Sequence, residues 1–252
     1  MSEPADTGPA PPSRRHFLIA LSAATALLAD KAEAQTSPPA TSPQSAPVTP
    51  ESPGPGDVLV PPIGPKGYRF LSSTEVETLT AMIDRLIPAD DVGPGGVEAG
   101  VVTFIDTELA GQFGVAARWY MQGPWADGTP SQGWQLAFTP AQLYRIGLLA
   151  LERWCLGGKG KRFAEMAPAD QDEVLALMEG GKIDLNGISS AVFFELLWQN
   201  TLEGYLSDPL YGGNREMAAW RMINFPGANP VLTDAVALKG ELYKVDPIAI
   251  AG

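Results

Sequence analysis

The sequence predicts an all-α protein, an irregular helical domain of about six or seven helices. From residue 72 onward, apolar residues recur at spacings of three and four, which is the period of one helix face. Glycine and proline interrupt these runs, and no run alternates apolar and polar residues as a half-buried strand would. The chain has 252 residues, of which 45% are apolar and 18% charged. That composition is sufficient for one sizeable domain with a buried core.

Residues 1–34 predict a signal peptide. Arg14 and Arg15 precede an apolar run that is shorter than the roughly 20 residues a membrane-spanning helix needs. A small-x-small sequence follows, so we expect cleavage between Ala34 and Gln35. The paired arginines before Phe-Leu resemble the twin-arginine export signal, although Ile19 stands where that motif often has lysine. We therefore expect a periplasmic protein; the alternative is a basic tail with no targeting role.

Residues 35–66 contain ten prolines and show no helical period. Such composition predicts a semi-stiff extended linker. The folded domain is therefore expected to comprise residues 67–252.

The first two helices of this domain are predicted on either side of a glycine-rich loop. Ser72 and Glu75 form a capping-box pattern that starts the first helix, and Pro88 ends it. The loop at 89–96 has two adjacent acids but lacks the regular acidic spacing of a calcium-binding loop. The second helix is expected at 97–109.

Three further helices are marked by their start signals. Thr139-Pro140 combines a cap with a proline at the first helical position, and Gly157-Gly158 is expected to end that helix. Pro168 opens the next helix. Ser189-Ser190 is expected to cap the long helix that follows.

The stretch 193–228 predicts a helix, a tight connector and a second helix. The first helix presents one face whose members follow the 3/4 spacing: Leu197, Asn200, Thr201, Gly204 and Tyr205. Asp208-Pro209 and Gly212-Gly213 break it. Asn214 is a plausible cap of the second helix, which Pro226 ends.

The loop at 119–138 is rich in aromatic residues set among turn residues, including Trp119, Tyr120, Trp125 and Trp134. Exposed aromatic side chains on a loop suit either sugar stacking or a protein interface. The alternative is satellite core packing beneath a long loop.

The sequence contains only one histidine and one cysteine. The only histidine, His16, lies in the segment we expect to be removed. The domain would therefore lack the imidazole of common zinc sites, di-iron sites, covalent haem and serine triads. The only cysteine, Cys155, allows a bond to another subunit or a buried thiol that acts as a small apolar group. The net charge of −12 makes nucleic acid a poor partner.

Two acids on the long helix were considered as a catalytic pair. Glu195 and Glu203 could suggest a glycosidase. Residues eight apart on a helix are about 12 Å apart along its axis, which is long for such a pair. A polar helix face is the alternative. No glycine-rich phosphate loop follows a strand, so we expect no nucleotide or flavin site in this chain.

One stretch runs from Phe193-Phe194-Glu195 through Asp208-Pro209-Leu210-Tyr211-Gly212-Gly213-Asn214. It is followed by Ala219-Trp220 and Phe225-Pro226-Gly227. Together these residues resemble gluconate 2-dehydrogenase subunit 3. The resemblance covers roughly residues 70–228. It implies a non-catalytic small subunit of a membrane-associated, acceptor-dependent sugar or polyol dehydrogenase. The partner would be a large flavoprotein of the glucose–methanol–choline oxidoreductase family that holds FAD. A multihaem cytochrome c is often a third subunit, and the large subunit would use the export signal of this chain.

The resemblance names no catalytic, cofactor-binding or metal-binding residue in this chain. The residues that we expect at the partner interface or in its scaffold are Trp198, Tyr205, Tyr211, Asn214, Arg215 and Trp220. Core packing and turn formation are the alternative roles for each of them. Two other functions remain open at this stage. One is a stand-alone periplasmic sugar-binding or hydrolytic protein that uses the loop 119–138, and the other is an interaction module with no redox partner.

Overall fold

The computed structural model describes residues 67–126, 128–129, 132–229, 233–238, 240–241 and 243–250. The expected signal peptide at 1–34 and the expected linker at 35–66 lie outside the described residues. The all-α prediction is confirmed, because the described residues form helices with only one small two-stranded sheet.

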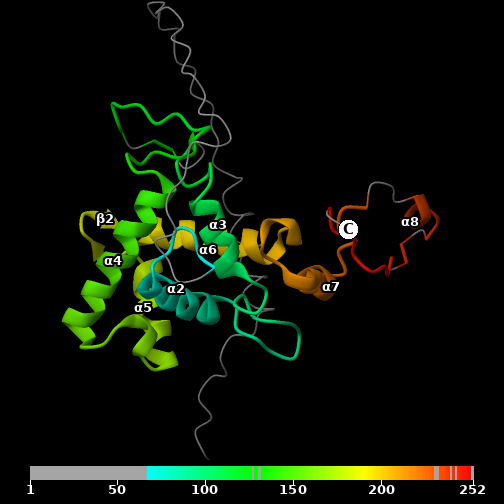
Figure 1. Ribbon diagram of the computed structural model, residues 1–252, viewed down its shortest axis with the longest axis horizontal. Coiled ribbons are helices and arrows are strands. Elements are labelled where there is room, and N and C mark those ends of the chain that lie inside the picture. The colour runs from blue at the N-terminus through cyan, green and yellow to red at the C-terminus, as the bar shows by residue number, and fades with distance from the viewer. Residues whose placement is uncertain are drawn as a thin grey trace, which may run out of the picture. The chain divides into compact units, whose positions relative to one another are not determined.

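The elements follow one another in the order shown in Figure 1. The α-helices are α2 (Ser73–Leu86), α3 (Val101–Leu109), α4 (Pro140–Lys159), α5 (Pro168–Glu179), α6 (Ser190–Leu206), α7 (Ala218–Ile223) and α8 (Thr233–Ala237). The 3-10 segments are η2 (Phe163–Glu165), η3 (Pro209–Tyr211) and η4 (Arg215–Met217), and the strands are β1 (Asp184–Leu185) and β2 (Ile188–Ser189). None of the helices in the described part of the chain is both long and apolar enough to cross a membrane.

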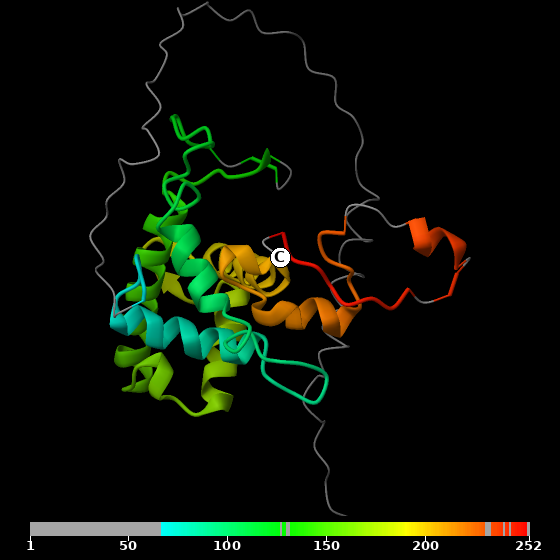
Figure 2. The same cartoon turned by 45° about the vertical axis from the view of Figure 1, so that its right-hand side comes forward.

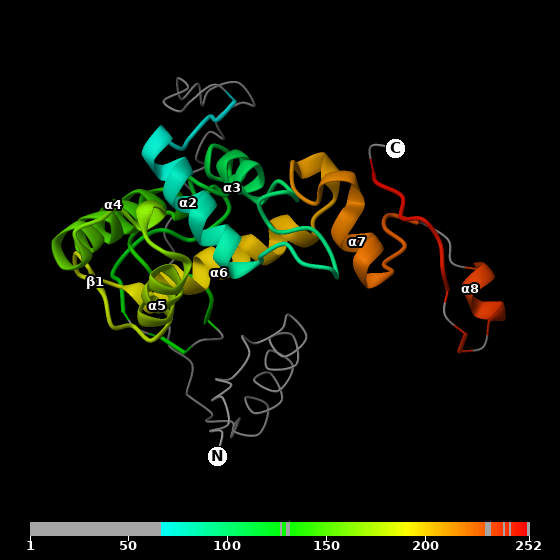
Figure 3. The same ribbon diagram turned by 90° about the horizontal axis from the view of Figure 1, so that it is seen from below.

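Helix α6 is the element against which most of the others pack. It contacts α2, α3, α4 and α5 along its length, and α7 near its C-terminal end (Figure 3). The face predicted from the 3/4 spacing is the buried one: Leu197, Asn200, Thr201, Gly204 and Tyr205. Burial of apolar area on such a face is the main source of helix stability in a small domain.

Two glycines let helices approach α6 closely. A Cβ atom added at Gly204 would lie 2.7 Å from the ring of Phe104 on α3. A Cβ atom added at Gly147 on α4 would lie 2.8 Å from the ring of Phe193 on α6. Both distances are below van der Waals contact, so a larger residue would force these helices apart.

The α4–α6 contact also contains a buried polar pair. The amide of Asn200 donates a hydrogen bond of 3.0 Å to the hydroxyl of Tyr144, and both side chains are buried. The Tyr144 ring meets Phe193 edge to face at 5.5 Å between centroids. Because each buried polar group needs a partner, this pair favours one relative placement of the two helices.

Several helix boundaries differ from the predictions. Helix α3 starts at Val101 rather than at residue 97, because Gly100 adopts a left-handed conformation with φ of 84°. Helix α4 continues through Gly157-Gly158 to Lys159 and ends at Gly160, which has φ of 70°. A glycine ends a helix only where the backbone takes this left-handed geometry.

A short hairpin was not expected. Strands β1 and β2 pair antiparallel, with Leu185 opposite Ile188. The two residues between them, Asn186 and Gly187, have φ of 60° and 87°. Positive φ at both positions is the geometry of the two-residue turn that Asn-Gly favours, so the Asn-Gly pair was the signal that the prediction missed.

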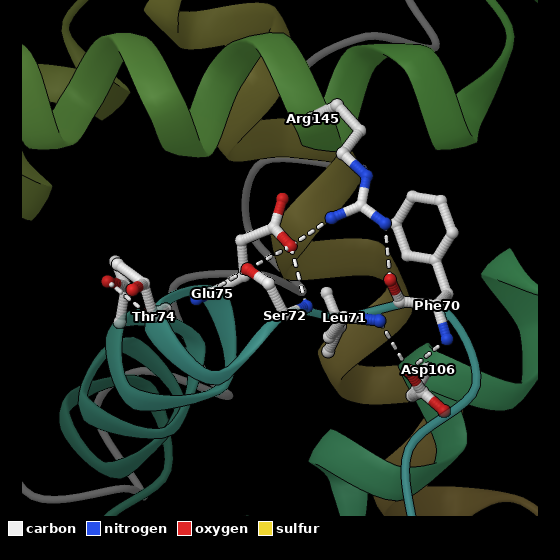
Figure 4. Close-up of polar contacts among 8 residues, drawn as sticks. Phe70, Leu71, Ser72, Thr74, Glu75, Asp106 and Arg145 are labelled. Carbon is white, nitrogen blue, oxygen red and sulfur yellow. Dashed lines mark hydrogen bonds and ion pairs between the residues drawn. The ribbon is translucent and has the colours of Figure 1, made fainter. Parts of the chain in front are cut away.

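The start of the domain is held by one buried carboxylate. Asp106 is 1% exposed and accepts the backbone N–H groups of Arg69, Phe70 and Leu71 at 2.7, 2.9 and 2.8 Å (Figure 4). Helix α3 thereby fixes the segment that leads into α2. The predicted capping box at Ser72 and Glu75 is present and begins that helix.

Arg145 on α4 joins the same segment to a third helix. Figure 4 shows its guanidinium between Glu75 and Phe70, where it donates to the Glu75 carboxylate and to the Phe70 carbonyl. The same guanidinium lies 4.1 Å from the centre of the Phe70 ring, within the range of a cation–π contact.

Candidate partner-binding surface

The turn after α6 is tied to the end of the chain by Asp208. One carboxylate oxygen accepts the N–H of Leu210 at 2.9 Å, and the other accepts the N–H of Ile250 at 2.7 Å. The tail is also paired near Pro226, where Ala228 donates to the Ile248 carbonyl at 2.7 Å. The turn and the tail therefore form one connected unit.

Two glycines make the turn sterically possible. Gly212 has φ of 91°, a conformation that other residues rarely adopt. A Cβ atom added at Gly213 would lie only 2.1 Å from the carbonyl oxygen of Gly204. The paired glycines are thus required because the turn folds back directly onto the α6 backbone.

Asn214 lies inside this turn and has no exposed surface. Its amide donates to the Ser207 carbonyl at 2.9 Å, and its amide oxygen accepts the N–H of Ala219 at 2.9 Å. Asn214 therefore provides a hydrogen-bond acceptor for an N–H group in the first turn of α7, although it lies five residues before Ala219 in sequence. Helix α7 begins only at Ala218, because Glu216 and Met217 both have positive φ.

Three aromatic residues expected at the interface or in its scaffold lie in the interior. Trp198, Tyr205 and Trp220 are all less than a tenth exposed. The Tyr205 hydroxyl donates to the Pro94 carbonyl at 2.8 Å, and Trp220 Nε1 donates to the Leu206 carbonyl at 2.8 Å. Their contacts within this chain are those of a scaffold.

The other two expected residues, Tyr211 and Arg215, are at the surface. Tyr211 is 49% exposed. Arg215 donates through its backbone to Ala99 at 3.0 Å and through its guanidinium to Thr103 Oγ1 at 3.2 Å. Arg215 therefore holds the turn against α3 while its side chain stays exposed.

An open groove of about 550 Å³ lies beside this turn, between α3 and α6. It is lined by Phe104, Glu108, Leu202, Glu203, Leu206, Ser207, Asp208 and Tyr211. Leu206 is 42% exposed and forms part of the apolar rim of this groove. We call this feature the α3–α6 groove.

The α3–α6 groove contains two carboxylates with altered acidity. Burial raises the pKa of Glu108. Burial also raises the pKa of Glu203, and the nearby negative charge of Glu108 raises it further. Neither carboxylate has a hydrogen bond or an ion pair with any described residue. Desolvation and like charge both disfavour the ionised form, which is why both values move upward.

More apolar side chains are exposed around the turn. Leu210 is 55% exposed, Ile223 51%, Phe225 44% and Ile250 62%. The Phe225 ring packs against the buried ring of Trp220, with 5.3 Å between the two centroids. Exposed apolar residues that gather in this way mark interaction sites more often than singly scattered ones do.

The aromatic loop between α3 and α4 is partly packed on itself. The Trp119 ring lies 5.6 Å from Phe113 and 5.0 Å from Trp134, and Trp134 Nε1 donates to the Phe138 carbonyl at 2.9 Å. Figure 2 shows the described part of this connection projecting away from the helices. Its most exposed aromatic residues are Tyr120, at 78%, and Trp125, at 40%.

The thiol of Cys155 is fully buried on the inner face of α4. Burial, with a further contribution from the charge of Glu152, raises its pKa to about 12. A buried neutral thiol behaves as a small apolar group, whereas a bond to another subunit needs an accessible sulfur.

Both acids of the candidate catalytic pair are exposed, but their surroundings differ. Glu195 accepts a hydrogen bond of 2.8 Å from the Gln199 amide, whereas Glu203 lines the groove. In the loop 89–96, Asp90 accepts the N–H groups of Val92 and Gly93, as turn-forming acids do. Across the described residues, no group of three or more His, Cys, Asp or Glu side chains could hold a metal ion.

The family model described as gluconate 2-dehydrogenase subunit 3 matches residues 73–227. The chain belongs to the gluconate 2-dehydrogenase subunit 3 family. Neither a curated protein nor a solved structure was found to match the chain. The match covers α2 to α7, so it includes the whole turn and the α3–α6 groove.

Within this family member, sequence reasoning found the turn but missed the groove. The six expected residues all lie inside the matched range, and the turn brings Tyr211, Asn214 and Arg215 together. The sequence paired Glu203 with Glu195 on the same helix, and nothing in it linked Glu203 to Glu108, 95 residues earlier. Only the packing of α3 on α6 brings them into one groove.

Proposed function

We propose that this chain is the non-catalytic small subunit of an acceptor-dependent dehydrogenase complex of the gluconate 2-dehydrogenase type. Its partner is a large flavoprotein of the glucose–methanol–choline oxidoreductase family, which binds FAD and oxidises the alcohol. A multihaem cytochrome c is the expected third subunit and would carry haem c. The complex is periplasmic, and its membrane association comes through the partner subunits.

The family match over the helical body is the observation that carries this proposal. Two features of the chain support it. Residues 35–252 contain no histidine, and the turn after α6 presents exposed apolar side chains around Tyr211. Aromatic and apolar side chains of this kind supply most of the energy of a protein interface.

The test is isolation of the native complex. The chain is given a C-terminal affinity tag on a spacer and isolated from periplasm and solubilised membranes of its own cells. We expect a large subunit to co-purify in a constant ratio and to give the absorbance spectrum of bound flavin. Recovery of the tagged chain alone, or with proteins that carry no flavin, would contradict the proposal.

Co-export is a separate part of the proposal. Arg14 and Arg15 lie in the expected signal, and a large subunit without a signal of its own would depend on them. Replacing both by lysine is expected to leave the chain and the flavoprotein together in the cytoplasm. A reporter exported in unfolded form serves as the control and is expected to be unaffected. Normal export of the flavoprotein beside the doubly substituted chain would refute the co-export role.

A second candidate function is a stand-alone sugar-binding protein that uses the aromatic loop. The exposure of Tyr120 and Trp125 favours it, because exposed rings can stack on sugars. Calorimetric titration of the purified mature chain with monosaccharides and polyols tests it. Binding that is lost on replacing Tyr120 by alanine would support this second function over the first.

A further inference from the structure

We propose that the α3–α6 groove receives a lysine or arginine side chain carried on an otherwise apolar segment of the large flavoprotein subunit. The inference rests on the proposed function and names the surface and the chemistry of that interface.

The shape of the groove suits a side chain with a long apolar stem. Phe104, Leu202, Leu206 and Tyr211 supply apolar lining, and the groove of about 550 Å³ is open to solvent on one side. Lysine and arginine bury their methylene stems against such surfaces while the charged group seeks a partner.

No basic residue among those that the structure describes compensates the charge of the groove. Its charged lining residues are Glu108 on α3, Glu203 on α6 and Asp208 in the turn. Both oxygens of Asp208 are already occupied by the Leu210 and Ile250 amides. Glu108 and Glu203 therefore face a space in which no described residue neutralises them.

Three surface acids elsewhere in the chain differ in this respect. Asp172 pairs with Arg85 at 2.7 Å, Glu173 with Lys159 at 2.8 Å, and Glu77 with Arg162 at 2.8 Å. Glu108 and Glu203 have no such pairing with any described residue, and partial desolvation raises the pKa of each. A cation from outside the subunit would relieve the like-charge repulsion and supply charge-assisted hydrogen bonds.

The two groove acids are carried on helices that pack tightly against each other. Gly204 meets Phe104 without space for a Cβ atom, and Glu203 and Glu108 each lie within a helical turn of that contact. Helices α3 and α6 therefore cannot separate to relax the repulsion without losing their packing. Such preorganisation strengthens binding because the site is already formed before the partner arrives.

Charge also favours the large subunit over two other occupants. A second copy of this chain carries the same net charge of −12. The proline-rich segment 35–66 has Lys66 as its one basic residue and two acids, Glu51 and Asp57. Neither offers a surface that is complementary to two carboxylates.

The first test changes the charge of the groove in the native complex. Glu203→Lys is expected to raise the dissociation constant roughly a hundredfold, and the double variant Glu108→Gln/Glu203→Gln roughly tenfold. Glu195→Lys, on the exposed surface of the same helix, is the matched control and is expected to change it less than about threefold. Dissociation is measured by diluting the purified complex and counting complexes by mass photometry.

The results separate the two proposals. If no flavoprotein co-purifies with the unaltered chain, the proposed function fails. If the flavoprotein binds the Glu203→Lys and double-glutamine variants as tightly as it binds the unaltered chain, only the groove assignment fails. Circular dichroism melts of each variant confirm that it is folded. The double-glutamine variant removes charge without adding bulk, so it keeps the test valid if Glu203→Lys does not fold.

The second test identifies the occupant directly. A photo-reactive phenylalanine derivative replaces Tyr211 in the complex, and the cross-linked peptides are identified by mass spectrometry. We expect a peptide of the large subunit with a lysine or arginine next to the attachment point. Attachment to residues 35–66, to a second copy of this chain or to a large-subunit segment without a basic residue would overturn the inference, as would failure to cross-link.

Discussion

Replacing Asp106 by alanine is expected to destabilise the domain by about 4 kcal/mol. The carboxylate accepts three backbone N–H groups at 2.7, 2.9 and 2.8 Å. Hydrogen bonds to a charged acceptor each contribute about 1.5–3 kcal/mol, and a buried N–H left without a partner costs about 1–3 kcal/mol. Arg69 is exposed and Phe70 half-buried, whereas Leu71 is fully buried. Water is therefore expected to replace the carboxylate at the first two N–H groups, so the expected loss is below the full sum.

Asparagine at position 106 provides an intermediate case. Its amide oxygen can still accept from Phe70 and Leu71, which both donate to the same carboxylate oxygen. Its amide nitrogen would face the N–H of Arg69, so one bond is lost and the other two become uncharged. We expect a loss of about 2–3 kcal/mol.

Urea unfolding of the purified mature chain, followed by circular dichroism, measures these losses. Asp172→Ala removes an exposed carboxylate that pairs with Arg85, and it is expected to cost less than about 1 kcal/mol. The slope of the unfolding free energy against urea concentration should be the same for each variant if the native and unfolded states are otherwise unchanged. A loss below about 1 kcal/mol for Asp106→Ala would refute the assignment of Asp106 as the anchor of the domain start.

Three further predictions follow from packing, burial and charge. Gly204→Ala is expected to lower the unfolding free energy by about 1–3 kcal/mol, because it overpacks the α3–α6 contact. Gly157→Ala has open space around its Cβ atom and should raise the unfolding free energy by about 0.5–1 kcal/mol. Equal effects of the two substitutions in urea melts would contradict this. Cys155 is expected to resist thiol reagents at pH 8 until the chain is unfolded, because its pKa is raised to about 12, and stoichiometric labelling of the native chain would refute this. Glu108 and Glu203 have folded-state pKa values raised above their unfolded values, so the stability that these two groups contribute to the free subunit should be fully present below the unfolded pKa and be lost as pH rises through the folded values. The double-glutamine variant should lose this part of the pH dependence, and parallel melting curves for the two proteins from acid to neutral pH would count against the assignment.

Local signals in the sequence predicted most of the helical order. The capping residues Ser72 and Thr139 and the helix-opening prolines at 140 and 168 each mark a start that the structure confirms. These signals work because they satisfy backbone groups within a few residues of themselves. The buried face of α6 was also predicted correctly, because helical periodicity is a local property.

Features that depend on distant partners were not predictable in the same way. Gly157-Gly158 was expected to end α4, yet the helix continues, because glycine ends a helix only when tertiary structure imposes a left-handed residue. The close pairing of Glu108 and Glu203 requires knowledge of how α3 lies on α6. The burial of Asn214 likewise depends on the fold of the turn around it.

The bond from the Ile250 amide joins the tail to Asp208, 42 residues earlier in the chain. Removal of the tail by a protease would take away that N–H donor and free one side of the turn after α6. Damage to the tail is therefore expected to loosen the surface around Tyr211, although the cut itself lies far from Tyr211 in sequence.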